Sequence, residues 1–410
     1  MSLPTLRLPA RLEGPLSAGH PWVYRDHVPS GTSVADGTWV RVEAGRTVAL
    51  GLWASDGAIA VRVFRRGRAD APPQVPDAAW VEATVARALA LRSGLEEAGS
   101  DAYRLVFGEG DGLPGITVDR YGRFAVLQTY ASGYRRDGSD AAELLRLVVR
   151  SLARAVPLTG VLRARREGAA AETVWGATPP PELTVHELGL RFLANLFEGQ
   201  KTGLFLDHRE HRAYVRDLAR GRRVANLFAY SGAFSVYALA GGARHALDVD
   251  VAPAALRDAA RNVAANADAI GADATERHET LRADLLSDPA AALAAPQLAG
   301  SDLIVLDPPS LARRKGQRHA ALRTYRRLNA AALAALPDGG LLATASCTAQ
   351  VSHEAFLGVL AEAAAEAGAQ AGVCAQVLHE SGHAPDHPVP LAFPEGRYLK
   401  FVVVRVTRPD

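Results

Sequence analysis

The stretch from Asp302 to Ser310 reads Asp-Leu-Ile-Val-Leu-Asp-Pro-Pro-Ser and constrains the fold more than any other segment of the chain. Its apolar residues predict a buried strand, and the prolines after Asp307 end it, because proline cannot donate to a strand ladder and its φ is fixed. Open α/β folds bind their ligands at the carboxyl edge of the sheet. The sequence therefore predicts a ligand site beside Asp307, although an ordinary strand followed by a turn would give the same pattern.

From about residue 190 onward, strand-like and helix-like segments alternate. Short apolar segments are followed by alanine-rich stretches of helical composition, an order that predicts βαβ units and a largely parallel sheet. We therefore expect an α/β domain at residues 190–410. Its expected strands are Val224–Phe228, His245–Asp250, Leu303–Leu306, Leu341–Ala345 and Tyr398–Val404.

Two smaller domains are expected before residue 190. Residues 1–72 contain β-branched and aromatic segments separated by glycines, at 37–43, 47–53 and 58–64, a pattern typical of a small β barrel. A proline-rich linker at 70–77 follows. Residues 73–189 combine strands with a helix expected at about 78–98 and another at about 141–155, and they predict an α+β domain without an obvious catalytic cluster.

The composition excludes several classes of protein. The chain is 48% hydrophobic and 22% charged, as is ordinary for a globular protein, and no charge-free segment is long enough to span a bilayer. Its two cysteines, Cys347 and Cys374, do not make a zinc site with the scattered histidines. Since we find no secretion signal, we expect a cytoplasmic protein with free thiols.

The first strand expected in the α/β domain leads into a glycine turn. Asn226–Ser235 reads Asn-Leu-Phe-Ala-Tyr-Ser-Gly-Ala-Phe-Ser, and Gly232 opens the following helix. The turn lacks the G-x-G-x-x-G pattern that brings backbone close to a pyrophosphate, which suits an adenosine cofactor without phosphates, such as S-adenosylmethionine, better than a nicotinamide or flavin. Asp250 ends the next strand and is preferred over Asp248 as the ribose ligand because it is nearer the carboxyl edge.

Four motifs, in this order, resemble one family. Gly19–Tyr24 resembles the start of a PUA domain, a small RNA-binding barrel, and Arg104–Tyr121 resembles a segment of that family's central domain. Glu198–Arg212 resembles its most distinctive signature, and Asp307–Ser310 its Asp-Pro-Pro loop. Over essentially the whole length, the sequence resembles the RlmI-like (YccW) family of class I S-adenosylmethionine-dependent methyltransferases, which act on carbon 5 of cytosine in 23S ribosomal RNA. The resemblance implies a Rossmann-like catalytic domain with a mostly parallel seven-stranded sheet.

The resemblance also implies which residues hold the cofactor. The turn from Asn226 to Gly232 would contact the methionine part of S-adenosylmethionine, Asp250 its ribose and Asp284 its adenine amine. Asp207 and residues 201–205 would close over it. For Asp284, a helix N-cap or a surface acid is the alternative. The expected cofactor-binding residues are Asp207, Asn226, Phe228, Tyr230, Gly232, Asp250, Asp284 and Asp307.

Cys347 follows an expected strand, one strand along the sheet from Asp307. A lone cysteine is usually a small core residue, but a thiolate that adds to carbon 6 of a pyrimidine makes carbon 5 nucleophilic, and a carboxylic acid can then protonate N3. We expect Cys347 to be the nucleophile and Asp307 the N3 partner, with the thiol activated by the nearby basic run. No cysteine follows the prolines and Cys374 is too distant to replace it, so the base that removes the C5 proton stays open.

Two other functions are consistent with the same fold. An RNA guanine-N2 or adenine-N6 methyltransferase would use a similar Pro-Pro turn with Cys347 merely structural, but such enzymes place Tyr or Phe after the prolines to stack on the flipped base, and Ser310 cannot stack. A non-catalytic RNA-binding scaffold is the second alternative. It is disfavoured because the acidic and thiol positions of the expected site are all intact.

Basic residues gather after the Asp-Pro-Pro-Ser loop, where residues 311–330 contain no acid. Such a run is often a solvated helix face, but here it also suits a lip that contacts RNA phosphates. Trp22 either stacks on a base or belongs to the barrel core. The expected partner is 23S ribosomal RNA, naked or in a partly assembled large subunit, and a homodimer stays open. The expected RNA contacts are Arg313, Arg314, Lys315, Arg318 and Trp22.

Overall fold

The computed structural model describes residues 3–164, 171–197, 204–312 and 314–408, and the statements below refer to these. Two compact units divide the chain. Unit 1 comprises Met1–Leu183, Asn195–Glu198 and Pro385–Gly396, and unit 2 comprises Thr184–Ala194, Gly199–Ala384 and Arg397–Asp410. Unit 1 therefore takes a short segment from near the C-terminal end of the chain. Within the described residues, no helix combines the length and the apolar character that crossing a membrane requires.

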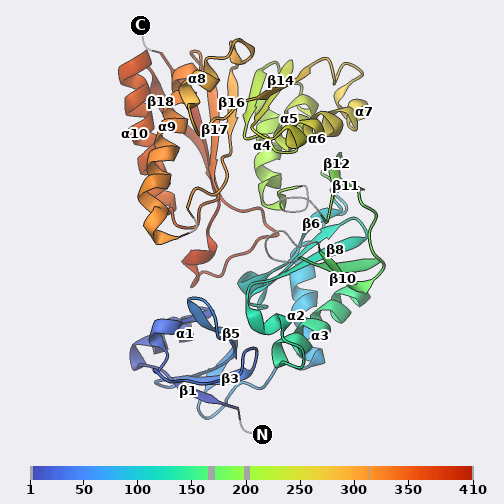
Figure 1. Cartoon of the computed structure of the whole chain (residues 1–410), viewed down its shortest axis with the longest axis vertical. Coiled ribbons are helices and arrows are strands. Elements are labelled where there is room, and N and C mark those ends of the chain that lie inside the picture. Colours follow the sequence, from blue (N-terminus) through green and yellow to red (C-terminus); the bar gives the residue numbers. More distant parts are fainter. Residues whose placement is uncertain (1–2, 165–170, 198–203, 313, 409–410) are drawn as a thin grey trace. The chain divides into compact units, whose positions relative to one another are not determined.

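Unit 1 contains two five-stranded sheets (Figure 1). The first has the order β1-β3-β4-β5-β2, and β4 is buried along its whole length. Apolar side chains of β3, β4 and β5 form its core together with Leu6 and Leu16. Its elements are β1 (Thr5–Arg7), α1 (Glu13–Ala18), β2 (Trp22–Tyr24), β3 (Trp39–Ala44), β4 (Thr47–Trp53) and β5 (Ile59–Arg68).

The second sheet of unit 1 has the order β10-β9-β8-β7-β6 and packs with two helices around one apolar core. Helix α2 ends at Ala90, earlier than the sequence predicts, because the chain then turns through Gly94 and Gly99 with φ of 89° and 77°. The elements are α2 (Ala78–Ala90), β6 (Ala102–Phe107), β7 (Ile116–Tyr121), β8 (Phe124–Thr129), α3 (Asp140–Ala155), β9 (Gly160–Arg163) and β10 (Glu172–Gly176).

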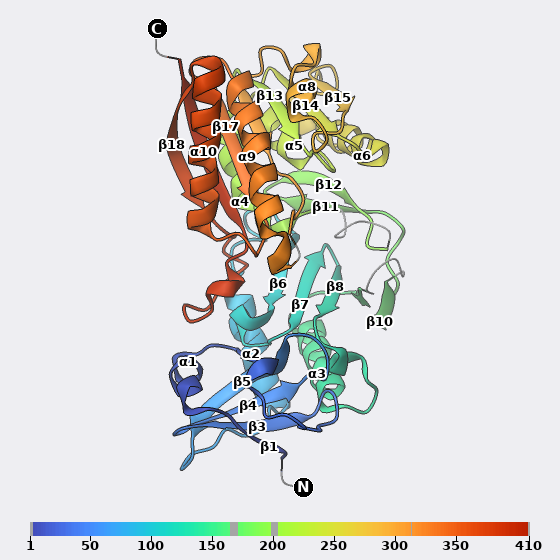
Figure 2. The same ribbon diagram turned by 60° about the vertical axis from the view of Figure 1, so that its left-hand side comes forward.

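Unit 2 is built on a seven-stranded sheet of order β15-β14-β13-β16-β17-β19-β18 (Figure 2). Strands β13 to β17 pair in parallel, and β19 runs antiparallel to both β17 and β18. The expected mostly parallel seven-stranded sheet is thus confirmed. The strands are β13 (Arg223–Leu227), β14 (His245–Asp250), β15 (His278–Arg282), β16 (Leu303–Leu306), β17 (Leu341–Ser346), β18 (Cys374–Ser381) and β19 (Lys400–Thr407).

Two groups of helices accompany this sheet. Alternate residues of the central strands, such as Ala225, Leu247 and Ile304, form a large core with α9 and α10. The residues between them, including Asn226 and Asp248, point to the opposite face. One group is α4 (Arg209–Leu218), α5 (Ala233–Ala240), α6 (Pro253–Ala264) and α7 (Ala267–Ile270), and the other is α8 (Pro289–Leu293), α9 (Arg318–Ala335) and α10 (His353–Ala371). A hairpin of β11 (Leu183–Glu187) and β12 (Leu190–Ala194) precedes them.

The direction in which the sheet is built reverses at β13. The chain adds β14 and β15 on one side of β13 and then returns to add β16 on the other. In open α/β sheets this reversal leaves a crevice at the carboxyl ends of the two central strands, and ligands bind there. A ligand bound there would contact the loops after β13, β14, β16 and β17.

Candidate functional site

The loop after β13 has an unusual backbone. Phe228, Tyr230 and Gly232 all have left-handed φ, of 60°, 50° and 73°. This conformation costs free energy for residues other than glycine, and such positions concentrate at functional sites. At Gly232 a Cβ atom would lie 2.6 Å from both the Cβ of Ala259 and Oδ2 of Asp248. Only glycine fits there, so the loop and the start of α5 form a tight backbone cradle at the sheet edge.

Asp250 and Asp248 occupy different environments. Asp250 is half-buried at the end of β14, where Oδ2 accepts from the backbone N–H of Tyr230 at 3.0 Å and Oδ1 from that of Ala252 at 2.9 Å. Asp248 is fully buried and accepts from Asn226 Nδ2 at 2.7 Å, Ser235 Oγ at 2.6 Å and His278 Nε2 at 2.8 Å. Of the two, Asp250 is the carboxylate at the edge, and Asp248 is an internal support.

Asn226 belongs to that internal support. Its side chain is buried, and its amide nitrogen donates to Asp248 beneath the loop. Asp284 lies in the loop after β15 and is exposed; its Oδ1 accepts from the backbone N–H groups of Leu286 at 3.0 Å and Ser287 at 3.2 Å. Asp284 is thus a surface acid that caps a turn and is not the N-cap of a helix. Its role toward the adenine stays a prediction.

The segment before α4 lies against the β13 loop. Phe205 contacts Tyr230 edge to face, with ring centroids 5.3 Å apart. Asp207 is buried, and its Oδ2 accepts from the hydroxyl of Tyr398 at 2.6 Å. Residues 201–203, which belong to the expected lid at 201–205, lie outside the described residues.

Asp307 and Cys347 follow adjacent parallel strands, β16 and β17. The two loops are joined, because the backbone N–H of Leu311 donates to Oγ1 of Thr348 at 3.1 Å. Cys347 is half-buried and forms no disulfide bond, and the side chain of Asp307 is 21% exposed. The structure therefore brings the two expected catalytic groups to the same edge of the sheet, and neither is sealed in the core.

Tyr325 of α9 contacts the residues on either side of Cys347. Its hydroxyl bonds Thr348 Oγ1 at 2.7 Å and accepts from Ser346 Oγ at 3.0 Å. Burial raises the pKa of Tyr325, and the negative charges of Cys347 and Asp307 act in the same direction, while the hydroxyl hydrogen bonds oppose them. Tyr325 therefore stays neutral and fixes the two loops without supplying charge.

The cation beside Cys347 is Lys400 of β19. Its ammonium donates to the backbone carbonyls of Thr348, Val351 and Tyr398, each at 2.8 Å, and its side chain is buried. Burial lowers the pKa of Lys400 to about 8, and the charge of Cys347 acts in the opposite direction. The sequence assigned activation of the thiol to the basic run at 313–327. A lysine directly before the apolar run Phe401–Val404 was the signal that could have identified Lys400.

Two histidines, His208 and His211, lie near Asp307 at the start of α4. His208 Nε2 lies 3.5 Å from Oδ2 of Asp307, and its Nδ1 lies 2.9 Å from Nδ1 of His211. Both imidazoles are buried. Sequence reasoning singled out the segment 198–212 but gave neither histidine a role; their i, i+3 spacing inside it was the available signal.

The expected RNA contacts are distributed over both units. In unit 2, Arg314 and Arg318 are exposed, Arg313 lies outside the described residues and the side chain of Lys315 is not among those described. In unit 1, Trp22 is half-buried, with its indole N–H donating to Glu109 at 2.7 Å and its ring packed edge to face on Phe393. Both partners lie outside the first sheet, and Trp22 is not part of its buried core, so the ring packs at the margin of the barrel and not inside it.

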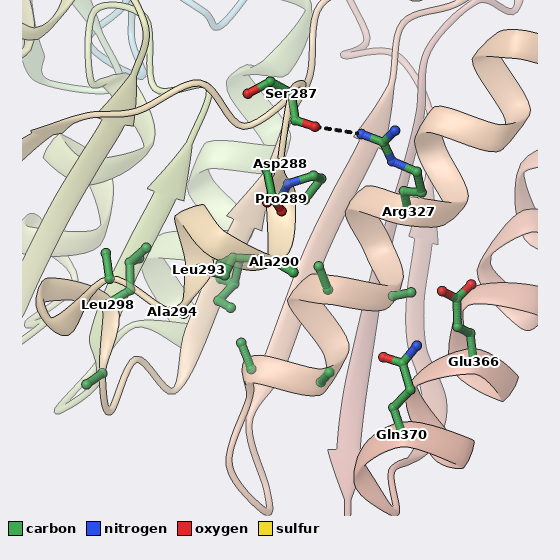
Figure 3. Close-up of a pocket in the computed structure, with 17 residues that line it drawn as sticks. Ser287, Asp288, Pro289, Ala290, Leu293, Ala294, Leu298, Arg327, Glu366 and Gln370 are labelled. Atoms are coloured by element: carbon green, nitrogen blue, oxygen red, sulfur yellow. Dashed lines mark hydrogen bonds between the residues drawn. The ribbon is translucent and has the colours of Figure 1, made fainter.

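A pocket of about 590 Å³ lies elsewhere in unit 2, lined by α8, α9 and α10 (Figure 3). Its walls are mostly alanine and leucine, and Arg327 donates to the carbonyl of Ser287 at its rim. None of the expected site residues lines it. Across the described part of the chain, no group of His, Cys, Asp or Glu side chains could hold a metal ion.

Comparisons with known proteins show which family the chain resembles. A family model described as S-adenosylmethionine-dependent methyltransferase matches residues 151–386, and one described as PUA-like domain matches residues 6–66. A ribosomal RNA large subunit methyltransferase of Deinococcus radiodurans is 37% identical, covering 98% of this chain and 97% of the relative. Ribosomal RNA large subunit methyltransferase I of Shewanella denitrificans is 33% identical, covering 98% and 99%.

Solved structures show the same fold over the whole length. A methyltransferase solved in complex with S-adenosylhomocysteine superposes with a TM-score of 0.82 at 22% identity, covering 98% of this chain and 100% of the other. A methyltransferase from Streptococcus mutans superposes with a TM-score of 0.80 at 21% identity, with the same coverage.

Proposed function

Because the chain belongs to the family of S-adenosylmethionine-dependent ribosomal RNA large subunit methyltransferases, we propose that it methylates carbon 5 of a cytosine in 23S ribosomal RNA through a covalent adduct with Cys347. The observation that carries the proposal is the placement of a half-buried thiol and a carboxyl group at the ends of adjacent strands. Methylation of an exocyclic amino nitrogen has no use for that thiol.

The sheet edge fits S-adenosylmethionine. The glycine cradle at residues 228–232 suits a ligand that approaches backbone closely, and the carboxylate of Asp250 suits the two hydroxyls of a ribose. Phe205 and Tyr230 offer apolar surface beside the cradle. When bound, the cofactor supplies an electrophilic methyl group on a sulfonium. Asp284 and Asp207 would border it from the neighbouring loops, as the family resemblance implies, and Asp248 and Asn226 would support the loop from below.

In the proposed reaction, the thiolate of Cys347 forms a bond to carbon 6 of the cytosine, and the electron pair of the C5–C6 double bond becomes available at carbon 5. N3 takes a proton from the carboxyl group of Asp307, which prevents negative charge from building on the ring. After carbon 5 is methylated, a base removes its proton. The C–H electron pair then restores the double bond and expels Cys347 as a thiolate, while N3 returns its proton. The ammonium of Lys400 stabilises the thiolate before attack and at release.

The RNA is proposed to contact basic side chains of unit 2 and the PUA-like domain of unit 1. Arg314 and Arg318 are exposed near the Asp307 loop and suit phosphate contacts, which position RNA without reading its sequence. Arg313 and Lys315 extend the same run. The target cytosine has to leave its stack to reach Cys347.

The experiment uses a transcript of 23S ribosomal RNA and nucleoside mass spectrometry. We expect 5-methylcytosine as the product, no detectable product from Cys347→Ala, and normal product from Cys374→Ala, which removes the exposed second thiol as a matched control. RNA containing 5-fluorocytosine should trap a covalent protein–RNA adduct that survives denaturation, because carbon 5 then carries no removable proton. Methylation by Cys347→Ala, or a methylated guanine or adenine as product, would replace the C5 reaction with the amino-nitrogen alternative.

A further inference from the structure

The buried histidine pair beside Asp307 has no role in the reaction proposed above. His208 presents Nε2 to Oδ2 of Asp307 at 3.5 Å and Nδ1 to Nδ1 of His211 at 2.9 Å. The ring of His208 is also held edge to face by Phe234 of α5. The side chain of His208 is 3% exposed, so its two ring nitrogens face protein groups and not bulk water.

His211 is a neutral partner in this pair. Burial lowers the pKa of His211 well below its ordinary value, and the positive charge of His208 acts in the same direction. Its ring stacks on Phe401 at a centroid distance of 4.2 Å. Because His211 is neutral, its Nδ1 can accept from Nδ1–H of His208, and this leaves Nε2 of His208 facing Asp307.

The reaction needs a proton at Asp307 that an ordinary carboxyl group does not hold. An aspartate side chain has a pKa of about 3.9, so almost none is protonated at neutral pH. N3 nevertheless has to receive a proton when the thiolate adds. Histidine is the side chain that exchanges a proton near neutral pH, and His208 is positioned to pass one to Asp307.

We propose that His208 stores the proton that Asp307 delivers to N3, with His211 holding the tautomer of His208; this inference rests on the proposed cytosine-C5 reaction. In this proposal the relay begins with His208 as the imidazolium and Asp307 as the carboxylate. As Cys347 bonds to carbon 6, the Nε2 proton moves to Oδ2 of Asp307 and the carboxyl group transfers it to N3. His208 is then neutral, with Nδ1–H still donating to His211. At product release N3 returns the proton by the same route.

The groups around the relay are consistent with this assignment. Tyr325 stays neutral because its pKa is raised, and Asp207 is bonded by the hydroxyl of Tyr398. The guanidinium of Arg212 is paired with Glu187 at 2.7 Å and both are buried. Arg209, which follows His208 and is fully buried, pairs with Glu210 at 3.1 Å. Cys347 and Lys400 belong to the nucleophile. His208 is thus a positioning residue, because it acts on the substrate only through Asp307.

The test combines kinetics with NMR on the full-length protein. His208→Gln keeps an N–H near the position of Nε2 but cannot exchange a proton. We expect it to lower the single-turnover methylation rate at pH 7 by about 100-fold. The pH profile of the rate should also differ between the unsubstituted protein and His208→Gln, because the variant keeps the titration of Lys400 but has no imidazole to supply a proton. His353→Gln, at an exposed histidine of α10 paired with Glu380, is the matched control and should behave normally.

The NMR measurement needs neither RNA nor cofactor. The ring protons of His208 are followed against pH, and in Asp307→Asn the midpoint of that titration should move down by about one pH unit, because the adjacent negative charge is gone. A midpoint that does not respond to Asp307→Asn, or a His208→Gln enzyme with the original pH profile, would overturn the relay. If such an enzyme still traps 5-fluorocytosine RNA, the relay fails while the C5 reaction stands. An unsubstituted protein that traps no RNA overturns both.

Discussion

The ammonium nitrogen of Lys400 lies 2.8 Å from the carbonyl oxygen of Thr348, the residue that follows Cys347. The pairing of β19 with β17 sets this contact, because Lys400 is opposite Ser346 in the antiparallel register. Further bonds to the carbonyls of Val351 and Tyr398 hold the ammonium in place. A fixed cation at the end of β17 favours the thiolate form of Cys347, which is the nucleophilic form.

Lys400→Met should therefore weaken the nucleophile. A thiol without a neighbouring cation titrates at about 8.5, and we expect the midpoint for alkylation of Cys347 by iodoacetamide to rise by about one pH unit in the variant. The measurement is made with Cys374→Ser in both proteins, so that Cys347 is the reporting thiol. An unchanged alkylation profile would show that Lys400 has no electrostatic effect on the thiol.

Lys400 also predicts a pH dependence of stability. Burial lowers its pKa in the folded protein to about 8, against an ordinary value of 10.5. Between these values the unfolded chain binds a proton that the folded chain does not, so the free energy of unfolding attributable to Lys400 rises with pH across this window. The rise is at most about 3 kcal/mol. Urea unfolding at several pH values between these limits should show the slope in the native sequence and lose it in Lys400→Met.

The sequence predicted best those strands whose apolar residues and flanking prolines or acids mark where the strand begins and ends. The apolar run before Asp307 and the two prolines after it end β16 where expected, and β14 has the expected bounds. β18 had no such pattern, because it lies at the edge of the sheet and most of its residues are exposed or half-buried. An edge strand needs no apolar run, so periodicity could not find it.

The parts of the site that the sequence missed depend on tertiary contacts. His208 meets Asp307 only because the turn before α4 and the end of β16 reach the same edge. Trp22 packs against Glu109 and Phe393, residues far along the chain that no local pattern could connect to it. The sequence did favour Asp250 over Asp248 as the edge carboxylate, because position within a strand determines distance from the edge.

The two aspartates of β14 should differ in what their loss affects. Asp250→Ala should lower the affinity for S-adenosylmethionine by roughly 10- to 100-fold, since hydrogen bonds to a charged group contribute about 1.5–3 kcal/mol. Asp248→Ala should instead destabilise the fold by about 3 kcal/mol, because it leaves Asn226, Ser235 and His278 buried without their acceptor. Calorimetric titration and urea unfolding measure the two effects. The reverse pattern would make Asp248 the ligand.

Gly232→Ala should damage both the cofactor site and the fold. The new Cβ would meet Ala259 and Asp248 at 2.6 Å, in addition to the cost of a left-handed φ of 73°. Gly242→Ala is a matched control, because Gly242 also has a left-handed φ, of 89°, but its Cβ would meet nothing closer than Arg220 at 3.8 Å. We expect Gly232→Ala to cost about 2 kcal/mol more in unfolding free energy than the control, as overpacking typically does. If both variants lost the same unfolding free energy, the space around Gly232 would not be too small for a Cβ atom.

Basic residues after the Asp307 loop should differ in how much each contributes to RNA binding. Arg318 is exposed at the start of α9, whereas the guanidinium of Arg327 is bonded to the carbonyls of Leu286 at 2.8 Å and Ser287 at 3.4 Å. A phosphate contact releases counterions, so Arg318→Ala should reduce the slope of log affinity against log salt by about 0.9. Arg327→Ala should change the slope less, because its guanidinium is already engaged within the protein. Filter binding of a 23S RNA transcript at several salt concentrations measures both slopes, and an unaltered slope for Arg318→Ala would remove this residue from the RNA interface.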